Sequence, residues 1–226
     1  MSEEREGFHL TIEEIAAVLA MGGKQKFVGF RGRNPGILTE ERMLNACCAM
    51  LRDGIMTQID GKFRLRRDLW EVMLPVYTAD SLLLVTPADE GSRQLACYGS
   101  GPVTVVEPAV YGGYSLTAME AGELAGQICR VLSLECFREE IPAPQLPEEA
   151  GPGPDADREE LLRGAVFVLE QISTDSNRRL RWLRCILVDG EPVLQWRERD
   201  ETVYRLMTES CLQEALREMM RGVTES

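Results

Sequence analysis

The chain reads Tyr114-Ser115-Leu116-Thr117 before one amphipathic helical pattern and Tyr204-Arg205-Leu206-Met207-Thr208 before a second. When Thr117 is placed on Thr208, the apolar residues of both patterns coincide at offsets of 4, 7, 8, 11, 12 and 15. These offsets follow one face of a helix with 3.6 residues per turn. Because runs of short strands precede both tyrosines, we predict two copies of a strand-rich unit that a helix closes.

Each copy is predicted to hold several antiparallel strands. In the first copy they are residues 81–86, 93–98, 103–108 and 111–116, followed by a helix at 117–132 that Thr117 caps. In the second copy they are residues 164–173, 179–188, 192–198 and 202–206. The two-residue turn Asp189-Gly190 fixes the register of the middle hairpin. This register places Leu183 opposite Trp196, Cys185 opposite Leu194, Ile186 opposite Val193, Arg184 opposite Gln195, Trp182 opposite Arg197, Arg181 opposite Glu198 and Arg179 opposite Asp200.

The first 80 residues are predicted to be mainly helical. Helices are expected at 10–20, at 39–52 and at 67–77, the last with Leu69, Trp70, Met73 and Leu74 on its apolar side. A hairpin around Asp60-Gly61 follows the second helix, which is the element order of a winged helix. The predicted fold class is therefore α+β, with an N-terminal winged-helix-like segment and two quasi-repeated antiparallel sheet-and-helix units.

Charge is distributed unevenly along the 226 residues. The formal net charge is −12, and residues 139–157 hold six acidic residues, five prolines and no basic residue. We therefore expect a linker there, between a first domain at 1–138 and a second at 158–226. The acidic balance argues against general nucleic-acid binding, which needs positive charge.

Cysteine content and hydropathy indicate the compartment. The seven cysteines include no CxxC pair, and several fall on apolar periodic positions, so we expect reduced, mostly buried thiols in a cytoplasmic protein. The N-terminus has no signal-peptide core, and no run of 18 apolar residues occurs, so we expect no association with a membrane.

No catalytic, metal or cofactor motif stands out. His9 is the sole histidine and is expected at the surface, and Gly22-Gly23-Lys24 lacks the spacing of a phosphate loop. Glu107, Glu120 and Glu123 could form a carboxylate site, but capping and solvation account for Glu120 and Glu123. The sequence therefore predicts a protein that is not an enzyme and that needs no cofactor.

Two sets of residues are candidates for binding. The first lies on the second hairpin, where core packing is the alternative role for both tryptophans: Trp182, Leu183, Trp196 and Arg197. The second is a basic run in an irregular connection at 24–37, which could meet an anionic partner: Lys24, Lys26, Arg31 and Arg33. The cluster at Arg178, Arg179, Arg181 and Arg184 is interpreted as a solvated sheet face.

The order of elements along the chain is Leu10-Thr11-Ile12-Glu13-Glu14-Ile15 in the first helix, Leu51-Arg52-Asp53-Gly54-Ile55 at the end of the second, the Asp60-Gly61 hairpin, a further helix and two strand-and-helix copies. This layout resembles the EspG family of cytosolic chaperones from type VII (ESX) secretion systems. The resemblance implies an α+β fold with internal quasi-two-fold symmetry and binding to the helical tip of exported protein pairs. We therefore expect a chaperone or adaptor that shields a helical protein partner, with its oligomeric state left open. The alternative is a winged-helix transcriptional regulator with a C-terminal sensing or dimerisation unit.

Overall fold

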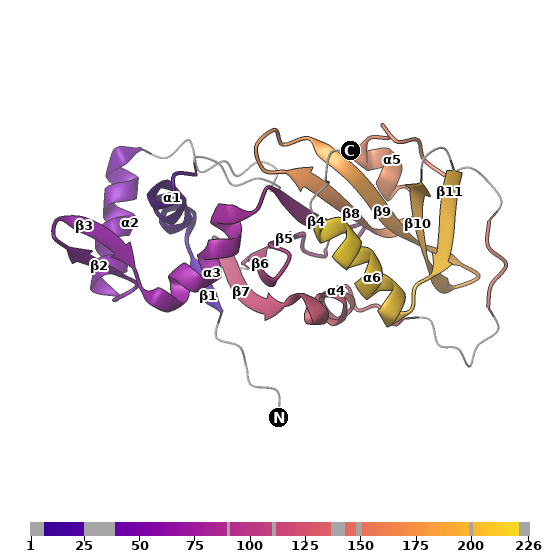
Figure 1. Ribbon diagram of the computed structural model, residues 1–226, viewed down its shortest axis with the longest axis horizontal. Coiled ribbons are helices and arrows are strands. Elements are labelled where there is room, and N and C mark those ends of the chain that lie inside the picture. Colours follow the sequence, from indigo (N-terminus) through magenta and orange to yellow (C-terminus); the bar gives the residue numbers. More distant parts are fainter. Residues whose placement is uncertain are drawn as a thin grey trace, which may run out of the picture. The chain divides into compact units, whose positions relative to one another are not determined.

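The computed structural model describes residues 7–24, 39–89, 91–109, 112–136, 143–147, 151–198 and 201–221. These residues form two compact units, each with antiparallel strands and helices (Figure 1). Unit 1 comprises Met1–Ala79 and Ala96–Met119, and unit 2 comprises Asp80–Leu95 and Glu120–Ser226. The α+β class predicted from the sequence is confirmed, whereas the domain boundaries at 138/139 and 157/158 stay a prediction.

Unit 1 combines helices and strands from two parts of the chain. Its elements are β1 (Phe8–Leu10), α1 (Ile12–Met21), α2 (Glu40–Arg52), β2 (Met56–Ile59), β3 (Lys62–Leu65), α3 (Arg67–Thr78), β5 (Leu95–Tyr98), β6 (Pro102–Pro108) and β7 (Tyr114–Glu120). The strand order is β1-β7-β6-β5, and β2 and β3 form a separate hairpin. The predicted order of helix, hairpin and helix is confirmed, while its interpretation as a winged helix stays a prediction.

Local sequence signals account for the ends of α1 and for the hairpin. The Thr11 hydroxyl accepts a hydrogen bond from the Glu14 amide at 3.2 Å, and the Glu14 carboxylate accepts one from the Thr11 amide at 2.8 Å. This reciprocal pair is the capping box that the sequence predicted. In the hairpin, Asp60 and Gly61 both adopt positive φ, at 52° and 72°, as a tight two-residue turn requires.

Unit 2 is a five-stranded antiparallel sheet with helices. Its elements are β4 (Ser81–Pro87), η2 (Ala121–Glu123), α4 (Leu124–Val131), α5 (Arg158–Leu162), β8 (Ala165–Ser173), β9 (Arg179–Val188), β10 (Glu191–Glu198), β11 (Glu201–Leu206) and α6 (Glu209–Met220). The strand order is β4-β8-β9-β10-β11, and each neighbouring pair is antiparallel. Buried residues of the strands and of α6 form its core, among them Phe167, Leu169, Leu183, Leu194, Leu212 and Leu216.

The chain repeats one order of elements. Four consecutive strands and a closing helix occur as β4-β5-β6-β7-α4 and again as β8-β9-β10-β11-α6. Within unit 2, the first strand of one copy, β4, pairs with the first strand of the other, β8, and the two closing helices, α4 and α6, contact each other (Figure 1).

The predicted start of the first closing helix is wrong. Thr117 lies inside β7, which continues to Glu120, and the capping box is formed by Glu120 and Glu123, with the Glu120 amide donating to the Glu123 carboxylate at 3.0 Å. Strand structure overrides the local capping signal here, because β7 is a neighbour of β6 in the sheet and continues through Thr117 to Glu120. Glu120 rather than Thr117 therefore corresponds to Thr208, the cap of α6.

The predicted register of the second hairpin is confirmed where the two strands pair. Leu183 faces Trp196, Cys185 faces Leu194, Ile186 faces Val193 and Arg184 faces Gln195. Arg181, predicted opposite Glu198, instead donates from Nε to the side-chain oxygen of Gln171 on β8 at 2.7 Å. The remaining expected charge pair involves Asp200, which lies outside the described residues.

Candidate functional site

The two faces of β9 carry different partners, because successive side chains of a strand point to opposite sides of the sheet. Arg181, Leu183 and Cys185 point to the side of α4 and α6. Trp182 and Arg184 point to the side of α5, where the Arg184 guanidinium donates to the carbonyl of Leu161 at 3.3 Å. The sheet of unit 2 is therefore sandwiched at this strand.

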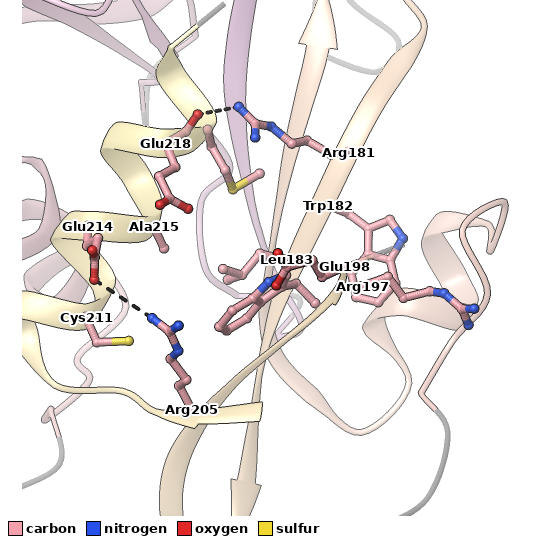
Figure 2. Close-up of a pocket in the computed structure, with 12 residues that line it drawn as sticks. Arg181, Trp182, Leu183, Arg197, Glu198, Arg205, Cys211, Glu214, Ala215 and Glu218 are labelled. Atoms are coloured by element: carbon pink, nitrogen blue, oxygen red, sulfur yellow. Dashed lines mark hydrogen bonds and ion pairs between the residues drawn. The ribbon is translucent and has the colours of Figure 1, made fainter. Parts of the chain in front are cut away.

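A pocket of about 330 Å³ lies between α6 and the strands β9, β10 and β11 (Figure 2). We call it the α6 pocket. Leu183 and Met219 are buried at its floor, at 3% and 5% exposure, and Trp196 is half-buried. Its polar rim includes Arg205 and three exposed acidic residues: Glu198, Glu214 and Glu218. An apolar floor with a charged rim is the usual anatomy of a protein-interaction site.

Arg205 shapes one wall of the α6 pocket. Its guanidinium carbon lies 5.4 Å from the centre of the Trp196 ring, within the range of a cation–π contact. The same guanidinium is 3.9 Å from the Glu214 carboxylate, and both side chains are more than half exposed (Figure 2). Such an exposed ion pair contributes about 0–1 kcal/mol, so Arg205 can exchange Glu214 for a charge on a partner at little cost.

Arg181 closes the opposite wall by binding the C-terminal end of α6. Its guanidinium donates to the backbone carbonyl of Glu218 in the last turn of α6 (Figure 2). It also donates to the carbonyl of Arg221, the C-cap residue, at 3.3 Å. The carbonyls of the last turn have no partner within the helix, and a cation there also favours the helix dipole. Desolvation by burial lowers the pKa of Arg181, and the Glu218 carboxylate opposes that shift. Arg181 thus fixes α6 to the sheet.

The four hairpin residues predicted to bind a partner divide between the two faces. All four residues are part of the lining of the α6 pocket, but Figure 2 shows the side chains of Trp182 and Arg197 turned to the other side of the strands. Trp182 is 6% exposed and packs with Ala156, Leu161 and Val168. It therefore has the alternative role of a core residue. Binding by this set of residues stays a prediction.

The α5 face is held by a buried charge cluster. The Glu170 side chain is 3% exposed, and its carboxylate lies 2.5 Å from Arg158 Nε and 3.4 Å from Arg179 Nη1. The Arg179 guanidinium also donates to the carbonyl of Ala156. Two residues of the segment expected to be a linker therefore contact the sheet. Ala156 is buried, and the Gly151 amide donates to the Thr202 hydroxyl at 3.1 Å.

The predicted basic site is not assembled by the described residues. Lys24 follows α1, where its backbone amide donates to the carbonyl of Leu19 at 2.9 Å. Lys26, Arg31 and Arg33 lie outside the described residues. An anionic partner at this run stays a prediction.

Sequence reasoning missed an exposed apolar surface on unit 1. On α3, Leu69 and Met73 are buried, but Trp70 and Leu74 are each 44% exposed, although all four were predicted to share one apolar side. Trp70 is stacked at a tilt against Tyr77, with ring centres 5.3 Å apart. Ile59 and Phe63 on the β2–β3 hairpin are exposed as well, but the hairpin register places them on opposite faces. The exposed apolar surface of unit 1 is therefore that of Trp70 and Leu74 on α3. The sequence showed the apolar stripe of α3, but it did not show which half of that stripe is covered by other residues.

The seven cysteines are free thiols with unequal burial. Cys97 and Cys185 are buried and Cys48 is exposed, while Cys47, Cys129, Cys136 and Cys211 are partly buried. Among the residues that the structure describes, no group of three or more His, Cys, Asp and Glu side chains is arranged to hold a metal ion. No helix in the described part of the chain is long and apolar enough to cross a bilayer.

Comparison with solved structures supports the fold. The chain is similar to the type VII secretion system chaperone EspG5 of Mycobacterium tuberculosis, whose structure was solved in complex with the PE25–PPE41 dimer. The TM-score is 0.51 with 9% sequence identity, and the match covers 95% of this chain and 96% of that chain. No family model and no curated protein match the sequence. At this identity the likeness shows a shared α+β fold, consistent with the resemblance drawn from the sequence.

Proposed function

We propose that this protein is a chaperone or adaptor of the type VII secretion kind, which binds a protein partner and shields its helical apolar surface. The observation that carries the proposal is the full-length match in fold, over 95% of this chain and 96% of a chaperone solved with a bound protein dimer. A likeness confined to one sheet would support a common architecture only.

We assign partner binding to the α6 pocket. Its volume of about 330 Å³ is at the small end of the range of about 300–1,000 Å³ typical of ligand sites, which suits one or two apolar side chains of a helix. Trp196 supplies a half-buried aromatic surface, and aromatic residues flanked by arginine are frequent anchors of interfaces. Because the rim carries both Arg205 and the carboxylates of Glu214 and Glu218, it favours a partner helix with charges of both signs beside its apolar anchor.

The test starts from affinity purification of the tagged full-length protein from its native cell, followed by mass spectrometry. The captured partner is then produced alone and together with this protein, and its soluble fraction is measured. We expect a helical protein that aggregates when produced alone and stays soluble in the complex. A partner that is equally soluble alone would contradict a shielding role.

Two matched variants locate the surface. Trp196→Ala removes the aromatic floor of the α6 pocket, and Trp70→Ala makes the same truncation on the exposed apolar surface of unit 1. We expect Trp196→Ala to weaken partner binding by about tenfold to thirtyfold, the effect of losing about 1.5–2 kcal/mol at a hot spot, and Trp70→Ala to leave it unchanged. The reverse result would move the binding surface to unit 1.

The same purification tests the transcriptional alternative. A regulator would retain promoter DNA in a salt-dependent manner. On α2, Glu40 and Glu41 form the first turn, and Arg42 lies 3.9 Å from the Glu13 carboxylate. This acidic helix surface does not favour binding to phosphates, so we expect no DNA retention at physiological salt.

A further inference from the structure

The chain reverses direction directly after α4. The amide of Leu134 donates to the carbonyl of Cys129 at 2.8 Å, and the amide of Ser133 donates to the carbonyl of Arg130 at 3.2 Å. Ser133 has a φ of 52°, the left-handed conformation at the C′ position of a helix. These two hydrogen bonds and this φ define a Schellman motif, which ends a helix and folds the following residues back over its last turn.

This reversal brings two thiols together. The sulfur atoms of Cys129 on α4 and Cys136 after the turn are 3.5 Å apart, and both residues are partly buried. A disulfide bond needs about 2.05 Å between the sulfurs, so a side-chain movement of about 1.5 Å is enough to close one. The backbone hydrogen bonds of the turn fix the chain reversal that brings Cys136 back towards Cys129, which makes the contact a property of the fold.

We propose that Cys129 and Cys136 form a modification site, a thiol pair that a peroxide oxidises to an intramolecular disulfide bond. This inference does not depend on the proposed chaperone function. It assigns a chemical role to two cysteines that neither the fold nor the α6 pocket requires.

The chemistry is a two-electron oxidation. The Cys136 thiolate attacks one oxygen of hydrogen peroxide, the O–O bond breaks, and a sulfenic acid forms while hydroxide leaves and takes up the proton lost by the thiol. The deprotonated Cys129 sulfur then attacks the Cys136 sulfur, the S–O bond breaks, and a second hydroxide leaves as water. Two thiols and one peroxide thus give one disulfide and two waters.

The order of the two steps follows from the surroundings of the sulfurs. Burial, and then the neighbouring Cys136 thiol, raise the pKa of Cys129 to about 12, so Cys129 is protonated at neutral pH and is assigned to the second step. Because the second step needs the Cys129 thiolate, we expect closure of the disulfide to accelerate as the pH rises from 7 to 9.

Other thiols are less suited to this reaction. Cys185 on β9 is buried, and its sulfur contacts the carbonyl of Ile186 at 3.9 Å. Cys97 is buried in unit 1, and Cys48 is exposed on α2. Cys185 therefore serves as the matched control, since it lies near the pair without being part of it.

The test uses the full-length reduced protein, treated with hydrogen peroxide under native conditions. After denaturation, thiol titration is expected to fall from seven thiols to five. Trypsin cleaves after Arg130 and separates the two cysteines, so a linked pair of peptides, 94–130 and 131–138, is expected and should disappear on reduction. Closing this short loop should also raise the Tm by about 5 °C.

Variants decide the assignment. Cys129→Ser and Cys136→Ser should each abolish the link and keep six thiols, whereas Cys185→Ser should still lose two of its six. Cys136→Ser changes a residue beyond the helix, so it remains informative even where Cys129→Ser lowers the yield of folded protein. A link to Cys185, a dimer linked through Cys48, or an unchanged count of seven thiols would overturn the proposal.

Discussion

Replacing Glu170 by Ala removes the one carboxylate that two arginines share on the α5 face of unit 2. Arg158 and Arg179 approach its two oxygens at 2.5 and 3.4 Å, from α5 and from β9 respectively. The side chains of the arginines are 16% and 21% exposed, so neither can fully regain water when the carboxylate is lost. The variant therefore leaves two poorly solvated cations side by side.

The expected loss of stability follows from the burial of this cluster. Removing one partner of a buried ion pair costs about 3–5 kcal/mol, because the remaining charge is left uncompensated. We expect Glu170→Ala to lie at the lower end of this range, at about 3 kcal/mol. Both arginines keep some exposure to solvent, and Arg179 still donates to the Ala156 carbonyl. For a chain of this length, about 3 kcal/mol corresponds to a decrease in Tm of about 6–12 °C.

Thermal and urea unfolding followed by far-UV circular dichroism measure this loss. The matched control is Glu159→Ala, which removes an exposed carboxylate from α5 itself and should change the free energy of unfolding by less than about 0.5 kcal/mol. A Glu170→Ala protein within 1 kcal/mol of the wild type, or a control that is equally destabilised, would refute the assignment of a structural role to this cluster.

Two further predictions concern α4 and the buried thiols. Ser133→Gly should raise the free energy of unfolding by about 1 kcal/mol in urea denaturation, because glycine adopts the positive φ of 52° without the cost borne by a residue with a Cβ. Burial raises the pKa of Cys97 and of Cys185 from 9.0 to about 12, so both stay protonated in the folded chain while the unfolded chain ionises near pH 9. Below pH 9 these thiols should therefore not lower the free energy of unfolding, and by pH 10.5 each should have lowered it by about 1–2 kcal/mol. This decrease should be smaller in Cys97→Ala.

The repeated element order could be predicted from the sequence, but the alignment of the two copies could not. Placing Thr117 on Thr208 pairs Leu124 with Ala215, whereas the caps in the structure pair Leu124 with Leu212. The Ala125 amide donates to the side chain of Gln213 at 3.3 Å, in agreement with the second alignment. Three residues turn a helix to within about 60° of a full turn, so residues three apart lie on nearly the same side. An apolar stripe therefore fits both alignments. The end of β7 and the hydrogen bond between Ala125 and Gln213 distinguish the two alignments.

The candidate site, too, could be predicted only in part from the sequence. Hairpin register followed from Asp189-Gly190, and strand alternation already separated Leu183 and Trp196 from Trp182 and Arg197. What the sequence could not show is which face is covered, because α5 spans only five residues and leaves no periodic pattern to detect. Its packing buries Trp182, while α6 leaves space above Trp196.

The most direct test of partner binding at the α6 pocket is hydrogen–deuterium exchange on the full-length protein, alone and with its purified partner. We predict slower exchange in peptides from residues 201–206 and 209–220, with little change in residues 56–78. Slower exchange confined to residues 56–78 would contradict the account, because it would place the partner on the exposed apolar surface of unit 1.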